Sequence, residues 1–178
     1  LFRSCGILAP SVRSTLLAHA KAFVSHGIPF IFDPGQTTPL FSGDELLALT
    51  RAAACVAFSD YEALMIKEHT SLSPAELSRL TGAVFCTHGS QGSSVWQKGE
   101  ETVIPAPKVE AVDPVGAGDA YRGGLLWGME RGLDAVSCAI AGTVMGAAKA
   151  TATGPSYRIN AELVEKAVRE GTPFDCWS

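Results

Sequence analysis

Short apolar runs alternate along the chain with longer segments whose apolar residues recur every three or four positions. Residues 28–32 (IPFIF), 54–58 (ACVAF) and 83–87 (AVFCT) are nearly continuous apolar runs, which is typical of strands covered on both faces of a parallel sheet. Residues 12–25 and 43–52 carry the apolar spacing of helices. The alternation predicts a three-layer α/β fold with a largely parallel central sheet and right-handed crossovers.

Recognisable start signals mark several of the expected helices. Residues 42–45 (SGDE) and 73–76 (SPAE) have the spacing of capping boxes. Residues 59–62 (SDYE) open a further helix, where acidic side chains are favoured by the helix dipole alone. Residues 135–150 form a long helix rich in Ala and Gly, and small residues let such a helix pack closely against its neighbours.

Further strands are expected at both ends of this pattern. Residues 6–8 form a short apolar run, plausible as the end of a buried strand. Residues 95–97 and 102–104 predict two strands around a tight turn at Lys98-Gly99.

Composition and charge exclude several classes of protein. The formal net charge is −4 and no basic cluster occurs, so no nucleic-acid partner is expected. No apolar run is long enough to span a bilayer, so no membrane partner is expected either. The five cysteines are scattered without a C-x-x-C pair, which argues against a disulfide framework or a zinc site and fits a cytoplasmic location. The length predicts a single α/β domain over residues 1–178.

The chemistry concentrates in residues 113–124, DPVGAGDAYRGG. Gly116, Ala117 and Gly118 directly precede Asp119, and a helix is expected from residue 120 to 129. The first N–H groups of a helix lack intrahelical partners and, with the helix dipole, favour an anion. A carboxylate beside a bound phosphate can accept a proton from an attacking hydroxyl. The alternative is structural, because glycine-rich turns before helices are common and Asp is a good N-cap.

Two better-known phosphate motifs do not match. No Lys follows a suitable Gly as a Walker A loop requires. The position of the third glycine in a dinucleotide fingerprint is Tyr121, which disfavours an oxidoreductase that binds a dinucleotide.

Residues 113–119 closely resemble the signature D-T-x-G-A-G-D of the ribokinase-like (PfkB) sugar and nucleoside kinases, with Pro114 in place of the usual Thr. The resemblance implies that Gly116, Ala117 and Gly118 hold the γ-phosphate of ATP and that Asp119 is the catalytic base. It covers almost the whole chain but only the carboxyl-terminal part of the family. We therefore expect residues 1–178 to be the carboxyl-terminal portion of a longer kinase, incomplete at the N-terminus, where the family carries its lid strands and most substrate-binding groups.

Other segments match the family's nucleotide and metal sites. Residues 59–62 resemble its N-x-x-E motif, with Ser59 replacing Asn, which implies that Glu62 helps to hold magnesium; Asp113 is assigned to the same metal. Residues 87–92 (THGSQG) resemble the T-x-G-x-x-G segment that borders the ATP phosphates. The alternative is a simple hairpin turn into residues 93–97, and both can hold. Residues 147–154 resemble the stretch that lines the adenine pocket, where main-chain carbonyls also help to form a monovalent-cation site. The residues expected to bind the nucleotide are Thr87, Gly89, Gly92 and Gly154.

The expected function is an ATP-dependent transfer of phosphate to a hydroxyl of a nucleoside or sugar. Adenosine is the first candidate acceptor, because residues 33–36 (DPGQ) resemble adenosine-kinase-like members; ribose or another sugar comes second. ATP and Mg²⁺ are the expected cofactors, with K⁺ as a further candidate and a homodimer as a candidate assembly. The alternative is a non-catalytic ATP-binding fragment that lacks the substrate half.

Overall fold

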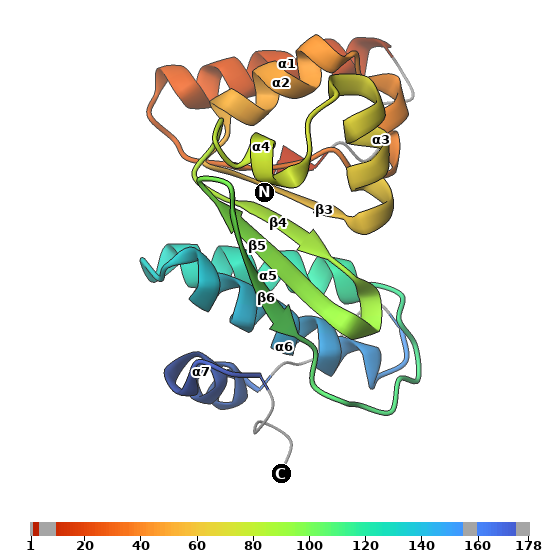
Figure 1. Cartoon of the computed structure of the whole chain (residues 1–178), viewed down its shortest axis with the longest axis vertical. Coiled ribbons are helices and arrows are strands. Elements are labelled where there is room, and N and C mark those ends of the chain that lie inside the picture. The colour runs from red at the N-terminus through yellow and green to blue at the C-terminus, as the bar shows by residue number, and fades with distance from the viewer. Residues whose placement is uncertain (1, 4–9, 155–159, 174–178) are drawn as a thin grey trace. The chain divides into compact units, whose positions relative to one another are not determined.

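The computed structural model describes residues 2–3, 10–154 and 160–173, and their side chains from residue 14 onward. The expected strand at residues 6–8 lies outside the described residues. The elements, in chain order, are β1 (Phe2–Arg3), α1 (Pro10–Ser25), β2 (Ile31–Asp33), the 3₁₀ segment η1 (Gly35–Leu40), α2 (Gly43–Ala52), β3 (Cys55–Ser59), α3 (Asp60–Thr70), α4 (Pro74–Leu77), β4 (Val84–Thr87), the 3₁₀ segment η2 (Gly89–Gln91), β5 (Gly92–Gln97), β6 (Glu100–Pro105), α5 (Ala117–Glu130), α6 (Ala135–Ala150) and α7 (Ala161–Glu170) (Figure 1).

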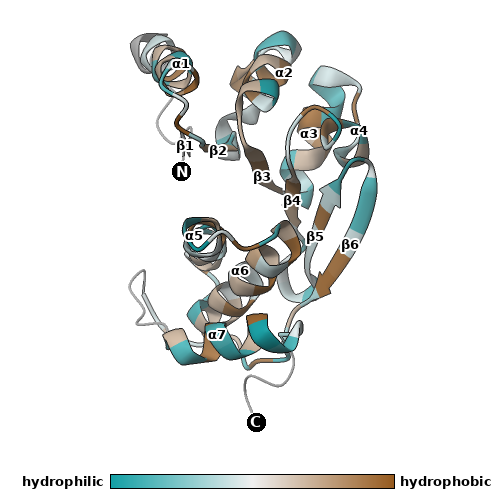
Figure 2. Ribbon diagram, turned by 90° about the vertical axis from the view of Figure 1, so that its left-hand side faces the viewer, coloured by the Kyte–Doolittle hydropathy of each residue, from teal (hydrophilic) through white to brown (hydrophobic). Residues whose placement is uncertain are grey.

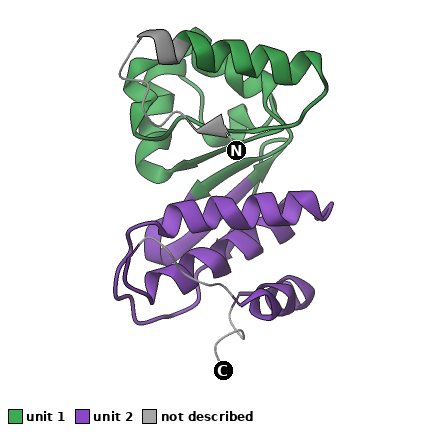
Figure 3. Ribbon diagram, turned by 180° about the vertical axis from the view of Figure 1, so that it is seen from behind, with its two compact units in different colours: residues 1–86, 96–101 green, residues 87–95, 102–178 purple. Residues whose placement is uncertain are grey.

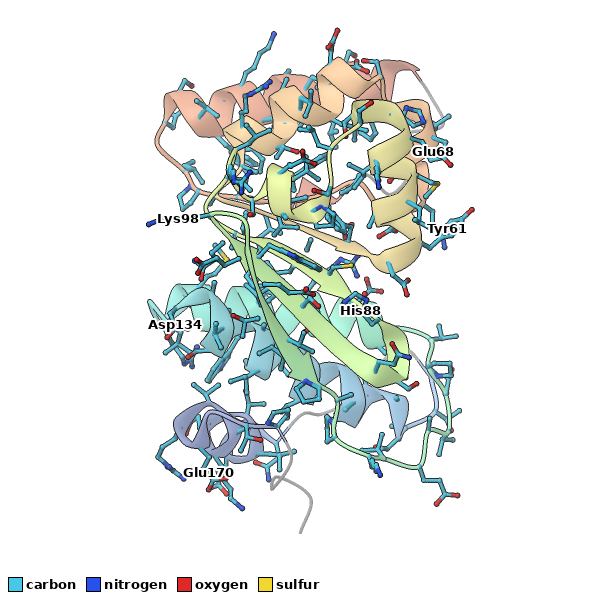
Figure 4. All side chains as sticks on the ribbon, viewed as in Figure 1. Tyr61, Glu68, His88, Lys98, Asp134 and Glu170 are labelled. Atoms are coloured by element: carbon cyan, nitrogen blue, oxygen red, sulfur yellow. The ribbon has the colours of Figure 1, made fainter. Side chains whose placement is uncertain are left out.

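The six strands follow one another in the order of the chain in one sheet. β1 pairs with β2 and β2 pairs with β3, both in parallel, with Phe32 opposite Phe2 and Ile31 opposite Cys55. β5 and β6 are joined at Lys98 and Gly99, whose φ angles of 55° and 93° are those of a tight hairpin turn; Figure 4 shows Lys98 at this turn. The turn was predicted at these two residues.

By its internal contacts the chain divides into two compact units (Figure 3). Unit 1 comprises residues 1–86 and 96–101, and unit 2 comprises residues 87–95 and 102–178. The expectation of a single domain stays a prediction. Among the described residues, no helix combines the length and apolar character needed to cross a membrane.

Unit 1 is built around the buried strands β2, β3 and β4, and Figure 2 shows β3 and β4 in the colours of hydrophobic residues. Their apolar side chains pack against α1, α2, α3 and α4 in one cluster. Within it, Phe32 and Phe41 meet edge to face with ring centroids 6.0 Å apart. The continuous apolar runs of the sequence are therefore strands covered by helices, as predicted.

Three helices of unit 1 begin with a complete capping box, in which a Ser side chain accepts from the backbone three residues later and a Glu side chain accepts from the Ser backbone. The pairs are Ser42 with Glu45, Ser59 with Glu62, and Ser73 with Glu76. The first and third were predicted. In the capping box of α3, Glu62, the residue expected to hold magnesium, accepts a hydrogen bond from the Ser59 backbone.

Unit 2 contains α5 and α6, which lie side by side (Figures 1 and 3). Glycines set their close approach: a Cβ on Gly124 would lie 2.5 Å from the Gly142 Cα, and one on Gly146 would lie 3.2 Å from the Ala117 carbonyl oxygen. The predicted close packing of the small-residue helix is confirmed. It fixes the start of α5, where the glycine-rich motif lies, against the second half of α6.

Candidate active site

The glycine-rich motif forms the N-terminus of α5. Gly116 is its N-cap residue with φ of 86°, a left-handed conformation that favours glycine. The Ala117 amide donates to the Pro114 carbonyl at 3.0 Å, and the Ala120 amide donates to the Gly116 carbonyl at 2.9 Å. Gly118 follows in the first turn, where a helix presents amides to an anion. Asp119 lies in the same turn with an exposed side chain.

A cavity of about 410 Å³ lies within unit 2 beside this helix start. Three segments that are far apart in the sequence line it, together with the loop before α5. Its described lining residues are Thr87, Gly89, Ser90, Gly92, Ala106, Pro107, Lys108, Val109, Ala111, Pro114, Ala117, Gly118, Tyr121, Thr143, Gly146, Ala147 and Ala150. A largely apolar wall with a few polar groups is typical of small-molecule sites.

The cavity brings together most of the residues assigned to the nucleotide. Thr87, Gly89 and Gly92 line it with Ala117 and Gly118, while Gly154 is not among the described lining residues. At two of these positions the backbone itself requires glycine. Gly89 has φ of 58°, and a Cβ on Gly92, where φ is 110°, would collide with the Ile104 carbonyl. The conformation of the turn therefore requires glycine whether or not phosphate binds there.

His88 begins the turn that carries these glycines, at the end of β4 (Figure 4). Its Nε2 lies 2.9 Å from the Ser94 Oγ. The imidazole is thus held by β5, and His88 is not among the described residues that line the cavity. This geometry favours a structural task for the histidine.

The Asp113 carboxylate holds the loop before the motif in place. Its Oδ1 accepts from the Val115 amide at 3.0 Å, and its Oδ2 accepts from the Gly154 amide at 3.0 Å. These hydrogen bonds, that from Val115 first, hold the pKa of the Asp113 carboxyl below its ordinary value. The Gly154 amide thus helps to hold the loop before α5 by donating to the Asp113 carboxylate. The assignment of Asp113 to magnesium stays a prediction.

Glu62 belongs to unit 1. Its Oε2 accepts from the Ser59 amide at 2.7 Å, and only 7% of the residue is exposed. No group of three or more His, Cys, Asp or Glu side chains that could hold a metal ion occurs in the part of the chain that the structure describes. The role of Glu62 at magnesium also stays a prediction.

Lys149 was given no role from the sequence. It lies in the last turn of α6, is 2% exposed, and donates from Nζ to two main-chain carbonyls, Ala152 at 3.0 Å and Asp113 at 3.2 Å. The one available signal was that Lys149 is the sole charged residue between positions 135 and 150. Lys108, an exposed cation on the cavity wall, was missed as well.

Comparison with known proteins gives this geometry a family. Residues 1–161 match the pfkB family carbohydrate kinases. A nucleoside kinase of Methanocaldococcus jannaschii is 29% identical over 141 residues, which are 76% of this chain and 47% of the relative. An inositol 3-kinase of Oryza sativa subsp. japonica is 36% identical over 101 residues, which are 53% of this chain and 25% of the relative.

A solved structure gives the same result for the fold. The nucleoside kinase of Burkholderia thailandensis in complex with inosine superposes with a TM-score of 0.81 at 33% identity, and the match covers 89% of this chain and 52% of that one. The predicted ribokinase-like α/β fold class is confirmed. The chain spans about half, or less, of the length of these nucleoside kinases and other curated relatives that it matches. Its match over residues 1–161 shows that the chain belongs to the pfkB family of carbohydrate kinases.

Proposed function

We propose that the chain carries the ATP site and the catalytic base of a kinase that phosphorylates a hydroxyl of a nucleoside. One observation carries the proposal: a single cavity in unit 2 combines the start of α5, the turn at residues 87–92 and an apolar wall. The amides at a helix start suit phosphate, and the apolar wall suits a purine base. Relatives named as nucleoside kinases support a nucleoside acceptor.

In the proposed reaction, the acceptor oxygen attacks the γ-phosphorus of ATP, and the bond from that phosphorus to the β–γ bridging oxygen breaks. ADP leaves with the electron pair of the broken bond. The proton of the acceptor hydroxyl passes to the Asp119 carboxylate. The amides of Gly116 and Gly118 stabilise the charge on the moving phosphoryl group, a preorganised effect that commonly dominates such catalysis. The Ala117 amide, which donates to the Pro114 carbonyl, shapes the turn between them.

We propose magnesium as a cofactor, but not potassium. Mg²⁺ enters with ATP and neutralises phosphate charge during the transfer, and Glu62 is the carboxylate that we propose to act on it. For K⁺, main-chain carbonyls of residues 147–154 are the expected ligands, but the Ala152 carbonyl among them already accepts from Lys149, as does the carbonyl of Asp113. The carbonyls of Ala152 and Asp113 therefore do not fit a potassium site.

Isothermal titration calorimetry with ATP and Mg²⁺ tests nucleotide binding by the purified chain. A phosphorylation assay with adenosine, inosine and ribose, in the same buffer, tests transfer and the choice of acceptor. Saturable binding of ATP with a stoichiometry near one supports the proposed site. Absence of binding at millimolar ATP contradicts it.

The second candidate is an ATP-binding chain without turnover. It is favoured by the coverage, because this chain spans only 47% of the Methanocaldococcus jannaschii relative. A kinase gains on the order of 7–11 kcal/mol from holding the two reactants in line, so a chain without a complete acceptor site should bind ATP and transfer phosphate near background rates. Robust turnover by residues 1–178 alone would rule this candidate out.

A homodimer and a cytoplasmic location complete the proposal. Tyr61 and Leu64 on α3 are 68% and 63% exposed, and exposed apolar side chains of this size support self-association. Figure 4 shows Tyr61 pointing away from α3. Sedimentation velocity tests the assembly; a monomer at every concentration used would exclude the dimer. The buried thiols of Cys55, Cys86 and Cys138 support a reducing compartment.

A further inference from the structure

Lys149 is a buried cation whose charge is taken up by main-chain oxygens. It is 2% exposed, and its Nζ donates to the carbonyl of Ala152 at 3.0 Å and to that of Asp113 at 3.2 Å. A buried ammonium is costly unless hydrogen bonds replace its water shell. Its place at the carboxyl end of α6 is favourable too, since a helix dipole attracts a cation there.

The two carbonyls belong to the two segments that frame the glycine-rich motif. Asp113 begins the loop that leads to Gly116, and Ala152 lies in the turn after α6. The same two segments are joined by the Asp113 amide, which donates to the Ala150 carbonyl at 3.0 Å, and by the bond from the Gly154 amide to Asp113. The Lys149 ammonium therefore sits at the junction of the loop and the turn.

The stem of the same side chain lies beside the N-cap of α5. A Cβ on Gly116 would lie 3.5 Å from the Lys149 Cε. The position of Gly116 sets the direction in which the first amides of α5 point. Lys149 thus contacts the loop at Asp113 and lies against the residue from which the proposed phosphate site begins.

Proteins bind potassium through carbonyl oxygens. Here the Lys149 ammonium occupies two such oxygens, those of Ala152 and Asp113. A second monovalent cation at these carbonyls would meet a like charge at close range. We propose that Lys149 is a built-in monovalent cation of this chain, and that it holds the phosphate-binding loop without potassium. The expected effect of Lys149 on ATP affinity rests on the proposed function. The expected effect of Lys149 on the stability of the loop does not.

The test compares the wild-type chain, Lys149→Ala and Lys149→Met in NaCl, KCl and NH₄Cl at equal ionic strength. The first readout is the melting temperature without nucleotide. Lys149→Ala opens space beside two carbonyls, so potassium or ammonium should stabilise it by mass action and raise its Tm by roughly 2–8 °C over NaCl. The wild-type Tm should be the same in all three salts. Lys149→Met fills the space without charge and should melt lower in every salt. Lys21→Ala, which removes an exposed lysine of α1, is the control.

The second readout is ATP affinity by calorimetry. In NaCl, loss of hydrogen bonds from a charged group should weaken ATP binding by Lys149→Ala roughly 10- to 100-fold, with partial recovery in KCl.

The inference is overturned if the Tm of Lys149→Ala does not depend on the cation, or if the wild-type Tm rises in KCl. If neither protein binds ATP, the proposed function fails, and the melting temperatures still decide the role of Lys149. If Lys149→Ala does not fold in NaCl, its folding in KCl supports the inference and its failure in both salts overturns it.

Discussion

Asp119 is the residue on which the proposed chemistry depends. It lies in the first turn of α5 with its side chain exposed, so an acceptor hydroxyl can reach it. If the chain phosphorylates an acceptor, Asp119→Asn should lower kcat by about two to four decades, which is the usual contribution of general-base catalysis. ATP affinity by calorimetry should barely change. Asp44→Asn removes an exposed carboxylate from the first turn of α2 and is the matched control. Near-normal kcat in Asp119→Asn would exclude it as the base.

Gly116 is held in a left-handed conformation with φ of 86°. An alanine there costs roughly 1–2 kcal/mol of strain, although its Cβ would meet nothing closer than 3.5 Å. If the loop shifts to relieve the strain, ATP binding by Gly116→Ala should weaken about 5- to 30-fold, the affinity equivalent of that energy. Gly27→Ala carries a similar strain at φ of 65° in unit 1 and should bind ATP normally. Equal ATP affinities for the two variants would show that Gly116 does not shape the phosphate site.

At the scale of elements, the contact between α5 and α6 positions the motif. A Cβ on Gly124 would lie 2.5 Å from the backbone of Gly142, and overpacking of this kind typically costs about 1–3 kcal/mol. Gly124→Ala should lower the free energy of unfolding by at least that amount in urea. Gly123→Ala is the control in the same helix: its Cβ would lie 3.5 Å from the flexible Met145 side chain, and the change should stabilise the helix by up to about 1 kcal/mol. Equal effects of the two changes would contradict the glycine-mediated packing.

The start of α3 has two explanations that experiment can separate. Glu62 closes a capping box with Ser59, and Gln also suits that position. If Glu62 also acts on magnesium, Glu62→Gln should raise the magnesium concentration needed for half-maximal rate while the melting temperature changes little. Glu76→Gln makes the same change in the capping box of α4 and should leave the magnesium dependence unaltered. An unchanged magnesium dependence in Glu62→Gln would leave Glu62 with the capping role alone.

Elements with local signals were predictable from the sequence. The boundaries of α6 match residues 135–150, and the capping boxes at Ser42 and Ser73 mark the observed helix starts. Boundaries without such signals were less accurate. α5 runs from Ala117 to Glu130, whereas a helix was expected from residue 120 to 129.

Long-range contacts were not predictable in the same way. The hydrogen bonds of Lys149 and Gly154 to Asp113 join positions 36 and 41 residues apart, and no periodicity reports such a contact. The assignments of Asp113 to magnesium and of Gly154 to the nucleotide stay predictions. What the sequence did not report is that the Asp113 carboxylate accepts from two backbone amides, one of them that of Gly154.

At the scale of the whole molecule, the two units carry different parts of the proposal. Unit 2 contains the cavity, the glycine-rich motif and Asp119, while Glu62 lies in unit 1. The family and its fold class rest on a match over residues 1–161. The substrate of the protein is a proposal because the chain spans about half the length of its relatives.

The central claim is that ATP phosphates bind at the start of α5 in unit 2. The most direct measurement is ¹H–¹⁵N chemical-shift mapping of the 18.6 kDa chain during titration with a non-hydrolysable ATP analogue and Mg²⁺. The largest shifts should fall on the amides of Gly89, Gly92, Ala117 and Gly118, which line one cavity. Saturable binding with its largest shifts in unit 1, or no shifts at millimolar analogue, would contradict the account.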